Sequence, residues 1–249
     1  MTETVSRCSS VAALSSRPHR FRGRIGVGLA GGFYPAPHRY LLYLSASCPR
    51  SLRVSITLDL LGLKKSVATT VLAGPADTPD AFASLRRAYE ATWHHYDGPL
   101  TAPALCDRWS GRVVSNHTPD ILRDLDGLAF DGNGDGADPR ITPLRPPALA
   151  SEIDALRDLL DRDVTPTAAR PERVSATLDL LNRQLADAAY VLGDKLTAAD
   201  VDLWVALVHL DATHTVSSYA GLRAYVQRLG NHPAFHGAVS AVGVGHRAA

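Results

Sequence analysis

Residues 39–63 read RYLLYLSASCPRSLRVSITLDLLGL, and this stretch decides the fold. Its first part, Arg39–Ser45, is rich in leucine and tyrosine and is typical of a strand. The part after Pro49 carries leucine and isoleucine at helical spacing, and proline is favoured at the first position of a helix. The stretch therefore predicts a strand, a tight turn at Cys48, and a helix.

Cys48 is placed where a helix N-terminus would stabilise a thiolate. Helix amides and the helix dipole lower the pKa of a thiol at this position, and Arg50 and Arg53 add positive charge nearby. Such a thiolate attacks sulfur or carbon electrophiles. A small buried hydrophobe is the alternative for any single cysteine, but the turn favours the reactive interpretation.

The other two cysteines lack this setting. Cys8 falls in a polar lead-in and Cys106 within a predicted strand. The three cysteines form no metal or disulfide pattern, which is typical of a reducing cytoplasm. Ser51 occupies the position of the second cysteine of a dithiol oxidoreductase, so Cys48 is predicted to act as a monothiol whose mixed disulfides are resolved by an external thiol.

An α/β half followed by an all-helical half is predicted from the pattern around this stretch. Strand and helix signals alternate up to about residue 126. The last of these elements is a helix that is expected to have Thr118 as its N-cap and Pro119 at its first position. Four helical segments follow a stretch rich in glycine and proline. The predicted domains are a lead-in at 1–20, an α/β domain at 21–126, a linker at 127–147 and a helical domain at 148–249.

Composition argues against several functional classes. The chain is 45% hydrophobic and 20% charged with a net charge of +1, which argues against a broad basic surface for nucleic acid. No apolar run approaches the ~20 residues of a membrane helix. The glycine-rich segment 26–32, the acidic segment 131–142 and the pair His232 and His236 each imitate a cofactor or metal site but lack its remaining elements. No metal site is predicted.

The segment TAAD, Thr197–Asp200, predicts the start of a buried helix. In this capping arrangement the Thr197 hydroxyl accepts from the amide of Asp200, and the Asp200 carboxylate accepts from the amide of Thr197. The helix is expected to bury Leu203, Trp204, Leu207 and Val208.

Taken together, these elements resemble a cytosolic glutathione transferase, with a thioredoxin-like domain before a helical domain. APAL, Ala102–Leu105, matches the site of the family's cis-proline, here Pro103, and LGDKLTAADVDLWV matches its capped buried helix. Within that superfamily the chain is similar to the Xi class, the glutathionyl-hydroquinone reductases. The segments that carry this similarity are FRGRIG, RYLLYLSASCPRSLR, VVSNHTPDILRDL and SEIDALRDLL.

The resemblance implies a mechanism in which Cys48 attacks the sulfur of a glutathionylated hydroquinone and holds the thiol as a mixed disulfide. The backbone of Ala102, before Pro103, would pair with the thiol peptide like an added strand. The family's pair Glu-Ser, which binds the γ-glutamyl end, is replaced by His117 and Thr118. Thr118 and the helix N-terminus still favour a carboxylate.

Further binding roles also follow from the resemblance. Ser115 and Arg50 are candidates for contact with the thiol, and Arg50 replaces a tryptophan of the family. Tyr219 is a candidate for contact with an aromatic substrate. The thiol would be glutathione or, in a mycothiol-producing source, mycothiol, and a homodimer is expected.

Three functions stay open at this point. The first is a cysteine-dependent thiol transferase or reductase that acts on a quinone-like or other aromatic electrophile. The second is an enzyme of the same fold used for conjugation or isomerisation in secondary metabolism, with Arg50 and His117 binding a substrate group or moving protons. The third is a non-catalytic binding protein.

Overall fold

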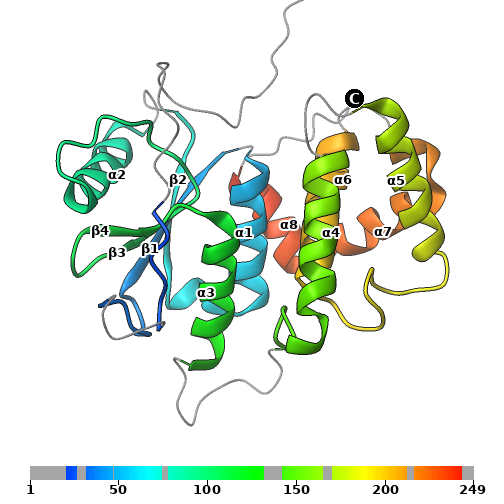
Figure 1. The fold of residues 1–249 in the computed structure, drawn as a ribbon, viewed down its shortest axis with the longest axis horizontal. Helices are drawn as coiled ribbons and strands as arrows, with labels where there is room; N and C mark the ends of the chain where they lie inside the picture. Colours follow the sequence, from blue (N-terminus) through cyan, green and yellow to red (C-terminus); the bar gives the residue numbers. More distant parts are fainter. Residues whose placement is uncertain are drawn as a thin grey trace, which may run out of the picture. The chain divides into compact units, whose positions relative to one another are not determined.

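The computed structural model describes residues 21–26, 32–46, 48–74, 78–131, 142–164, 170–211 and 216–242. The chain divides into two compact units, Met1–Ile141 together with Ala238–Ala249, and Thr142–Gly237 (Figure 1). Among the described helices, none has the length and apolar character needed to cross a bilayer.

A four-stranded sheet forms the centre of the first unit, in the strand order β2-β1-β3-β4. Strands β1 and β2 are parallel, while β3 is antiparallel to both β1 and β4. In chain order the elements are β1 (Tyr40–Ser45), α1 (Pro49–Leu60), η2 (Leu63–Lys65), β2 (Ala68–Leu72), α2 (Pro79–Thr92), β3 (Ala104–Asp107), β4 (Arg112–Ser115) and α3 (Thr118–Asp131).

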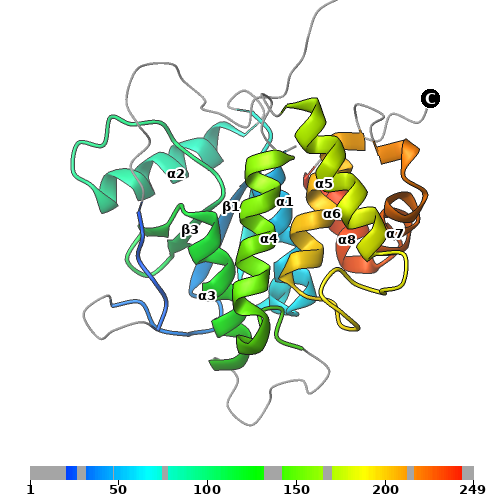
Figure 2. The same cartoon turned by 45° about the vertical axis from the view of Figure 1, so that its right-hand side comes forward.

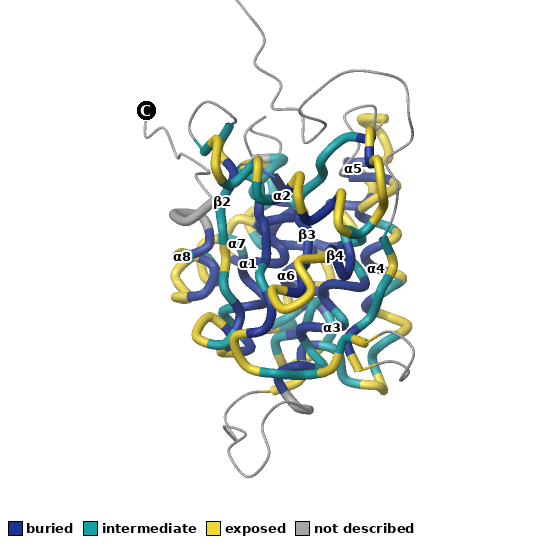
Figure 3. The backbone as a smooth tube through the Cα atoms, turned by 90° about the vertical axis from the view of Figure 1, so that its left-hand side faces the viewer, coloured by how far each residue is buried: buried dark blue, intermediate teal, exposed yellow. Residues whose placement is uncertain are grey.

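Helices cover both faces of this sheet, α2 on one face and α1 with α3 on the other (Figure 1). Tyr43, Cys106 and Val113 belong to one buried cluster with Leu85 and Tyr89 of α2. Side chains alternate along a strand, so their neighbours in sequence point to the opposite face, and these are buried as well. The strands therefore lie inside the unit, as the dark tube of β3 shows in Figure 3.

Helix α3 differs from the prediction at both ends. It begins at Thr118, where the carbonyl of His117 accepts from the amides of Asp120 and Ile121 at 3.0 and 3.1 Å. Thr118 is thus the first helical residue and not the N-cap, and Pro119 is the second.

The helix also continues to Asp131, five residues into the predicted linker. Leu125 and Leu128 are buried at helical spacing, and the packing of this apolar stripe overrides the weak helix propensity of Gly127. The rest of the predicted linker up to residue 141, and most of the glycine-rich segment 26–32, lie outside the described residues.

Helices make up the second unit in its described part, with α4 and α6 packed side by side (Figures 1 and 2). Arg157 of α4 donates to Asp202 of α6 at 2.8 Å in a buried pair. In chain order the elements are η3 (Pro147–Leu149), α4 (Ala150–Asp163), α5 (Pro171–Gln184), α6 (Ala198–Asp211), η4 (Val216–Ser218), α7 (Ala220–Gly230) and the first half of α8 (Pro233–Val242), whose residues from Ala238 onward are assigned to the first unit.

The capping arrangement before α6 is confirmed in part. The Thr197 amide donates to the Asp200 carboxylate at 2.9 Å, as predicted. The Thr197 hydroxyl, however, donates to the same carboxylate at 3.1 Å and was expected to accept. Asp200 also accepts from the Tyr225 hydroxyl at 2.8 Å, a long-range partner that no local motif reveals. Leu203, Trp204 and Leu207 are buried as predicted, whereas Val208 is only half-buried.

Candidate active site at one end of the sheet

The register of the sheet brings three chain segments of the first unit to one end. Strand β1 runs toward Cys48, and its Tyr43 pairs with Ala104 at the start of antiparallel β3. Strand β4 ends at Ser115, which pairs with Leu105 near that same start. The turn at Cys48, the loop before β3 and the loop after β4 therefore share one end of the sheet, here called the Cys48 end.

Cys48 is the N-cap residue of α1, with the extended backbone angles φ −90° and ψ 120°, and Pro49 begins the helix. The Cys48 side chain makes no capping hydrogen bond and is 1% exposed. Ser51, in the first turn, accepts a hydrogen bond from the Ser45 amide at 2.9 Å through its hydroxyl. This contact ties the end of β1 to α1, which gives Ser51 a structural role.

The oxidation state of Cys48 corrects one expectation. Cys48 is disulfide-bonded in the structure, whereas the sequence showed no disulfide pattern. Cys106 is a buried free thiol. The predicted nucleophile is the reduced form of Cys48, because only a thiolate attacks.

The loop before β3 contains a cis peptide bond between Ala102 and Pro103, as the resemblance predicts. The preceding Thr101 is held from two sides. The Tyr89 hydroxyl lies 2.8 Å from the Thr101 hydroxyl, and the side-chain amide of Asn116 donates to that same hydroxyl at 3.1 Å. Tyr89 and Asn116 thus link the proline loop to the loop after β4.

Tyr89 and Asn116 carry no site role in the sequence prediction. Burial raises the pKa of Tyr89, and hydrogen bonds with Thr101 and Asn116 act in the opposite direction. The hydroxyl therefore stays protonated at neutral pH and donates to Thr101. Asn116 belongs to the segment VVSN, so its place was visible in the sequence, but its partner Tyr89 lies 27 residues away.

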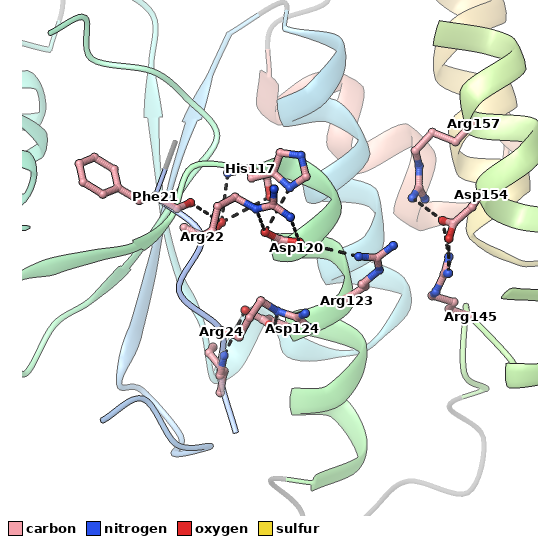
Figure 4. Close-up of polar contacts among 12 residues, drawn as sticks. Phe21, Arg22, Arg24, His117, Asp120, Arg123, Asp124, Arg145, Asp154 and Arg157 are labelled. Atoms are coloured by element: carbon pink, nitrogen blue, oxygen red, sulfur yellow. Dashed lines mark hydrogen bonds and ion pairs between the residues drawn. The ribbon is translucent and has the colours of Figure 1, made fainter. Parts of the chain in front are cut away.

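The loop after β4 leads into a charged cluster at the start of α3 (Figure 4). The Nδ1 atom of His117 lies 3.2 Å from Oδ2 of Asp120, and Nη1 of Arg123 lies 3.8 Å from Oδ1. Arg22 donates to both carboxylate oxygens of Asp120. Burial alone would raise the pKa of Asp120, but the Arg22 hydrogen bond and the charges of His117 and the arginines lower it.

A second ion pair lies one turn further along α3. Arg24 donates to Asp124 at 2.6 Å, and the Ile25 amide donates to the other oxygen of Asp124 at 3.2 Å. Two residues of extended chain span about 6.6–6.8 Å and four helical residues about 6 Å, so Arg22 and Arg24 match the spacing of Asp120 and Asp124.

Gly23 stands between the two arginines for a steric reason. A Cβ atom there would lie 2.6 Å from the carbonyl oxygen of Val114 in β4, a contact that side chains do not tolerate. The extended segment therefore approaches β4 closely, and Arg22 forms an antiparallel bridge with Ser115. This explains the segment FRGRIG, whose arginines the sequence prediction left without a role.

The remaining predicted residues are placed as follows. Ser115 is fully buried, and its hydroxyl accepts from the His117 amide at 3.1 Å. Arg50 is exposed on the first turn of α1, while Thr118 is buried. Tyr219 lies in the second unit, where its hydroxyl is 3.2 Å from that of Ser175.

No group of three or more metal-ligating side chains occurs among the described residues. His232 and His236 are both exposed near the start of α8. The Nδ1 atom of His232 instead accepts from the amide of Ala234 at 3.2 Å, a contact within the first turn. This histidine therefore caps a helix.

Comparison with known proteins shows what this arrangement is similar to. Residues 165–228 match the model described as glutathione S-transferase, C-terminal domain. The glutathionyl-hydroquinone reductase YqjG of Escherichia coli is 29% identical, over 85% of this chain and 74% of that protein. The chain has the glutathione transferase fold and is similar to the Xi class.

Solved structures agree with this conclusion. The glutathione-bound structure of YqjG, a glutathione transferase homologue from Escherichia coli, has a TM-score of 0.74 and 27% identity, covering 88% of this chain and 83% of that one. Glutathione transferase Xi 1 from Trametes versicolor has a TM-score of 0.72 and 26% identity, covering 89% of each chain. The relatives are reductases and transferases, and the chain is an enzyme of this transferase or oxidoreductase type.

Proposed function

We propose that this glutathione transferase-like chain is a thiol-dependent reductase that removes glutathione from an aromatic, quinone-like electrophile through reduced Cys48. The observation that carries the proposal is the meeting of the Cys48 helix N-terminus, the Pro103 loop and the Ser115–Thr118 loop at one end of the sheet. The names of the relatives point to the same reaction.

The proposed reaction has two sulfur-transfer steps. The Cys48 thiolate attacks the sulfur of the aryl thioether, a sulfur–sulfur bond forms, and the aryl–sulfur bond breaks. The aromatic ring keeps the bonding electron pair and takes up a proton, so it is reduced to the hydroquinone. A second glutathione thiolate then attacks the mixed disulfide, releasing glutathione disulfide and restoring Cys48.

Binding of the cosubstrate is assigned to the loops around Cys48. The backbone of Ala102 would pair with the peptide part of glutathione, and His117 with Thr118 would meet its γ-glutamyl end. Arg50 and Ser115 complete this proposed set. Glutathione is the first thiol to test and mycothiol the second, and we expect the reaction in a reducing compartment such as the cytoplasm.

The test is turnover by the wild type, Cys48→Ser and Cys48→Ala after full reduction, because Cys48 is disulfide-bonded in the structure. Hydroquinone release from glutathionyl-hydroquinone with glutathione is measured, and intact mass detects the adduct on Cys48. We expect a loss of turnover by at least about a hundred-fold in both variants, because the nucleophile is removed. Full activity in both would overturn the proposal.

Cys106→Ala is the matched control. The Cys106 thiol is buried, and this raises its pKa to about 12, so it stays protonated and unreactive at neutral pH. Turnover and adduct formation should survive in Cys106→Ala. Turnover without any Cys48 adduct would favour a conjugation or isomerisation enzyme that uses Arg50 and His117. An unreactive Cys48 with no turnover would favour a binding protein.

A further inference from the structure

We propose that Asp120 is a positioning residue that holds the His117 imidazole in place for the thiol cosubstrate at the Cys48 end of the sheet. The proposal rests on the proposed function, because that function assigns His117 to thiol binding. Asp120 itself does not touch the reacting atoms in this arrangement and acts through its neighbour.

The backbone position of His117 is fixed by Ser115. This residue follows Ser115 by two positions, and its amide donates to the Ser115 hydroxyl, so its backbone is fixed at the end of β4. Its side chain is 24% exposed, while the Asp120 side chain is 3% exposed. The Nδ1–Oδ2 distance of 3.2 Å meets the distance of an ion pair but not the geometry of a hydrogen bond, so the carboxylate holds the imidazolium form of the ring by charge attraction.

The carboxylate that His117 contacts is itself held rigidly. Arg22 donates to both oxygens of Asp120, at 3.1 Å for the Nη2 bond, so the carboxylate plane is fixed from the side of the extended segment. Arg22 in turn forms a backbone bridge with Ser115. Segment, strand and helix thus hold the carboxylate together (Figure 4).

Ordering a side chain when a ligand binds costs free energy. An imidazole without this anchor would lose rotamer freedom when the cosubstrate binds, and that loss weakens binding. With Asp120 in place the ring is ordered beforehand. The expected effect of Asp120 is therefore on affinity for the thiol, with the chemistry at Cys48 unchanged.

Asp124 provides a matched control one turn along the same helix. It too is a buried aspartate paired with an arginine of the extended segment, Arg24. Asp124 accepts from the Ile25 amide, whereas Asp120 contacts a histidine. Asp120→Asn disturbs the Arg22 pair and the longer Arg123 contact, while Asp124→Asn disturbs the Arg24 pair, and only Asp120→Asn also alters the contact with His117.

The experiment measures the Kd of glutathione by calorimetry in the Cys48→Ser background, and KM and kcat in chains with Cys48 intact. We expect Asp120→Asn to raise Kd and KM roughly ten-fold with little change in kcat, since ordering one side chain accounts for about that factor. Asp124→Asn should leave Kd and KM within about two-fold of the wild type.

A double-mutant cycle separates positioning from general destabilisation. His117→Gln alone should raise Kd, and Asp120→Asn should add nothing further in the His117→Gln background, because its effect runs through the ring. Wild-type Kd in His117→Gln overturns the proposal even if Asp120→Asn fails to fold. Equal loss of affinity in Asp120→Asn and Asp124→Asn, or additive effects in the cycle, also overturns it.

The proposed function fails in a different way. A wild-type chain that neither binds glutathione nor forms a Cys48 adduct would overturn the proposed function and this proposal together. Glutathione binding with a normal Cys48 adduct, but unchanged Kd in His117→Gln, would overturn only the role of Asp120. The two failures are thus distinguishable.

Discussion

The two ends of the central sheet differ in how their polar groups are used. At the Cys48 end, the loops of three strands carry Cys48, the cis-proline Pro103 and His117. Beside them lie the ion pairs of Asp120, where the His117 side chain is 24% exposed. At the opposite end, where β1 begins and β3 ends, Arg39 and Asp107 form a buried pair with side chains 5% and 1% exposed.

The Arg39–Asp107 pair makes contacts on several sides, although the Nη1 atom of Arg39 is buried without a hydrogen-bond partner among the described residues. Two guanidinium nitrogens donate to Asp107 at 2.8 and 3.0 Å, and Ser110 adds a hydroxyl bond at 2.7 Å. The guanidinium also lies over the rings of Tyr34 and Trp109, at 4.3 and 4.7 Å from their centroids. Such a buried network stabilises one arrangement and presents no reactive group, so a dense polar cluster alone does not mark a site.

The largest effect is expected where this buried network is broken. Asp107→Ala leaves the Arg39 charge buried without its carboxylate, which should reduce the free energy of unfolding by about 3–5 kcal/mol. Urea denaturation measures the loss, and turnover per folded molecule should be unchanged because the pair lies at the far end of the sheet.

Asp59→Ala is the control for that measurement. Asp59 pairs with Lys64 at 2.6 Å, but the Lys64 side chain is 51% exposed, so this pair should contribute less than about 1 kcal/mol. A loss in Asp107→Ala no larger than that in Asp59→Ala would show that the two ends of the sheet do not differ as described.

Local patterns in the sequence predict the Cys48 end well. The predicted strand 39–45 and the helix after Cys48 agree with β1 and α1 to within a few residues, because strand periodicity, a turn and a proline at the first helical position are local signals. The disulfide at Cys48 was not predicted, since cysteine pairing is not readable from spacing alone.

Pairings over long sequence distances were missed. Arg22 and Asp120 are 98 residues apart, and Arg39 and Asp107 are 68 apart. The matching spacing of the arginines in FRGRIG and the aspartates of α3 is visible only once the two segments are known to be neighbours. The start of α3 was missed by one residue because the His117 carbonyl, and not the Thr118 side chain, begins its hydrogen bonding.

A smaller effect is expected from Ser51→Ala at the Cys48 end. The variant removes the hydroxyl that accepts from the Ser45 amide, so we expect a loss of about 1–2 kcal/mol in the free energy of unfolding. Ser110→Ala is the counterpart at the other end. It removes one of several donors to Asp107 and should cost less than Ser51→Ala. The reverse order, measured by urea denaturation, would contradict this view of the two ends.

The smallest expected effect is on how the free energy of unfolding depends on pH, which should differ between Asp120 and Asp124 of α3. Burial raises the pKa of Asp124 despite the Arg24 hydrogen bond, while the Arg22 hydrogen bond and nearby charges outweigh burial and lower the pKa of Asp120. The folded state thus holds the Asp124 proton to a higher pH than the unfolded chain does, and loses the Asp120 proton at a lower pH.

Linkage gives the two groups opposite signs. Asp120 contributes stability above its unfolded pKa of about 3.9, and this is lost as pH falls through its lower folded pKa. The Asp124 contribution instead falls as pH rises from about 3.9 through its higher folded pKa, because the folded state then gives up a proton.

Unfolding free energies between about pH 3 and 7 should therefore show Asp120→Asn losing most, on the order of 1 kcal/mol, near neutral pH. Asp124→Asn should flatten the decline in the free energy of unfolding that Asp124 causes as pH rises. Parallel curves of unfolding free energy against pH for the two variants would mean that both ion pairs share one electrostatic environment. That result would contradict the contrast between Asp120, which is surrounded by cationic groups, and Asp124, whose pKa is dominated by burial.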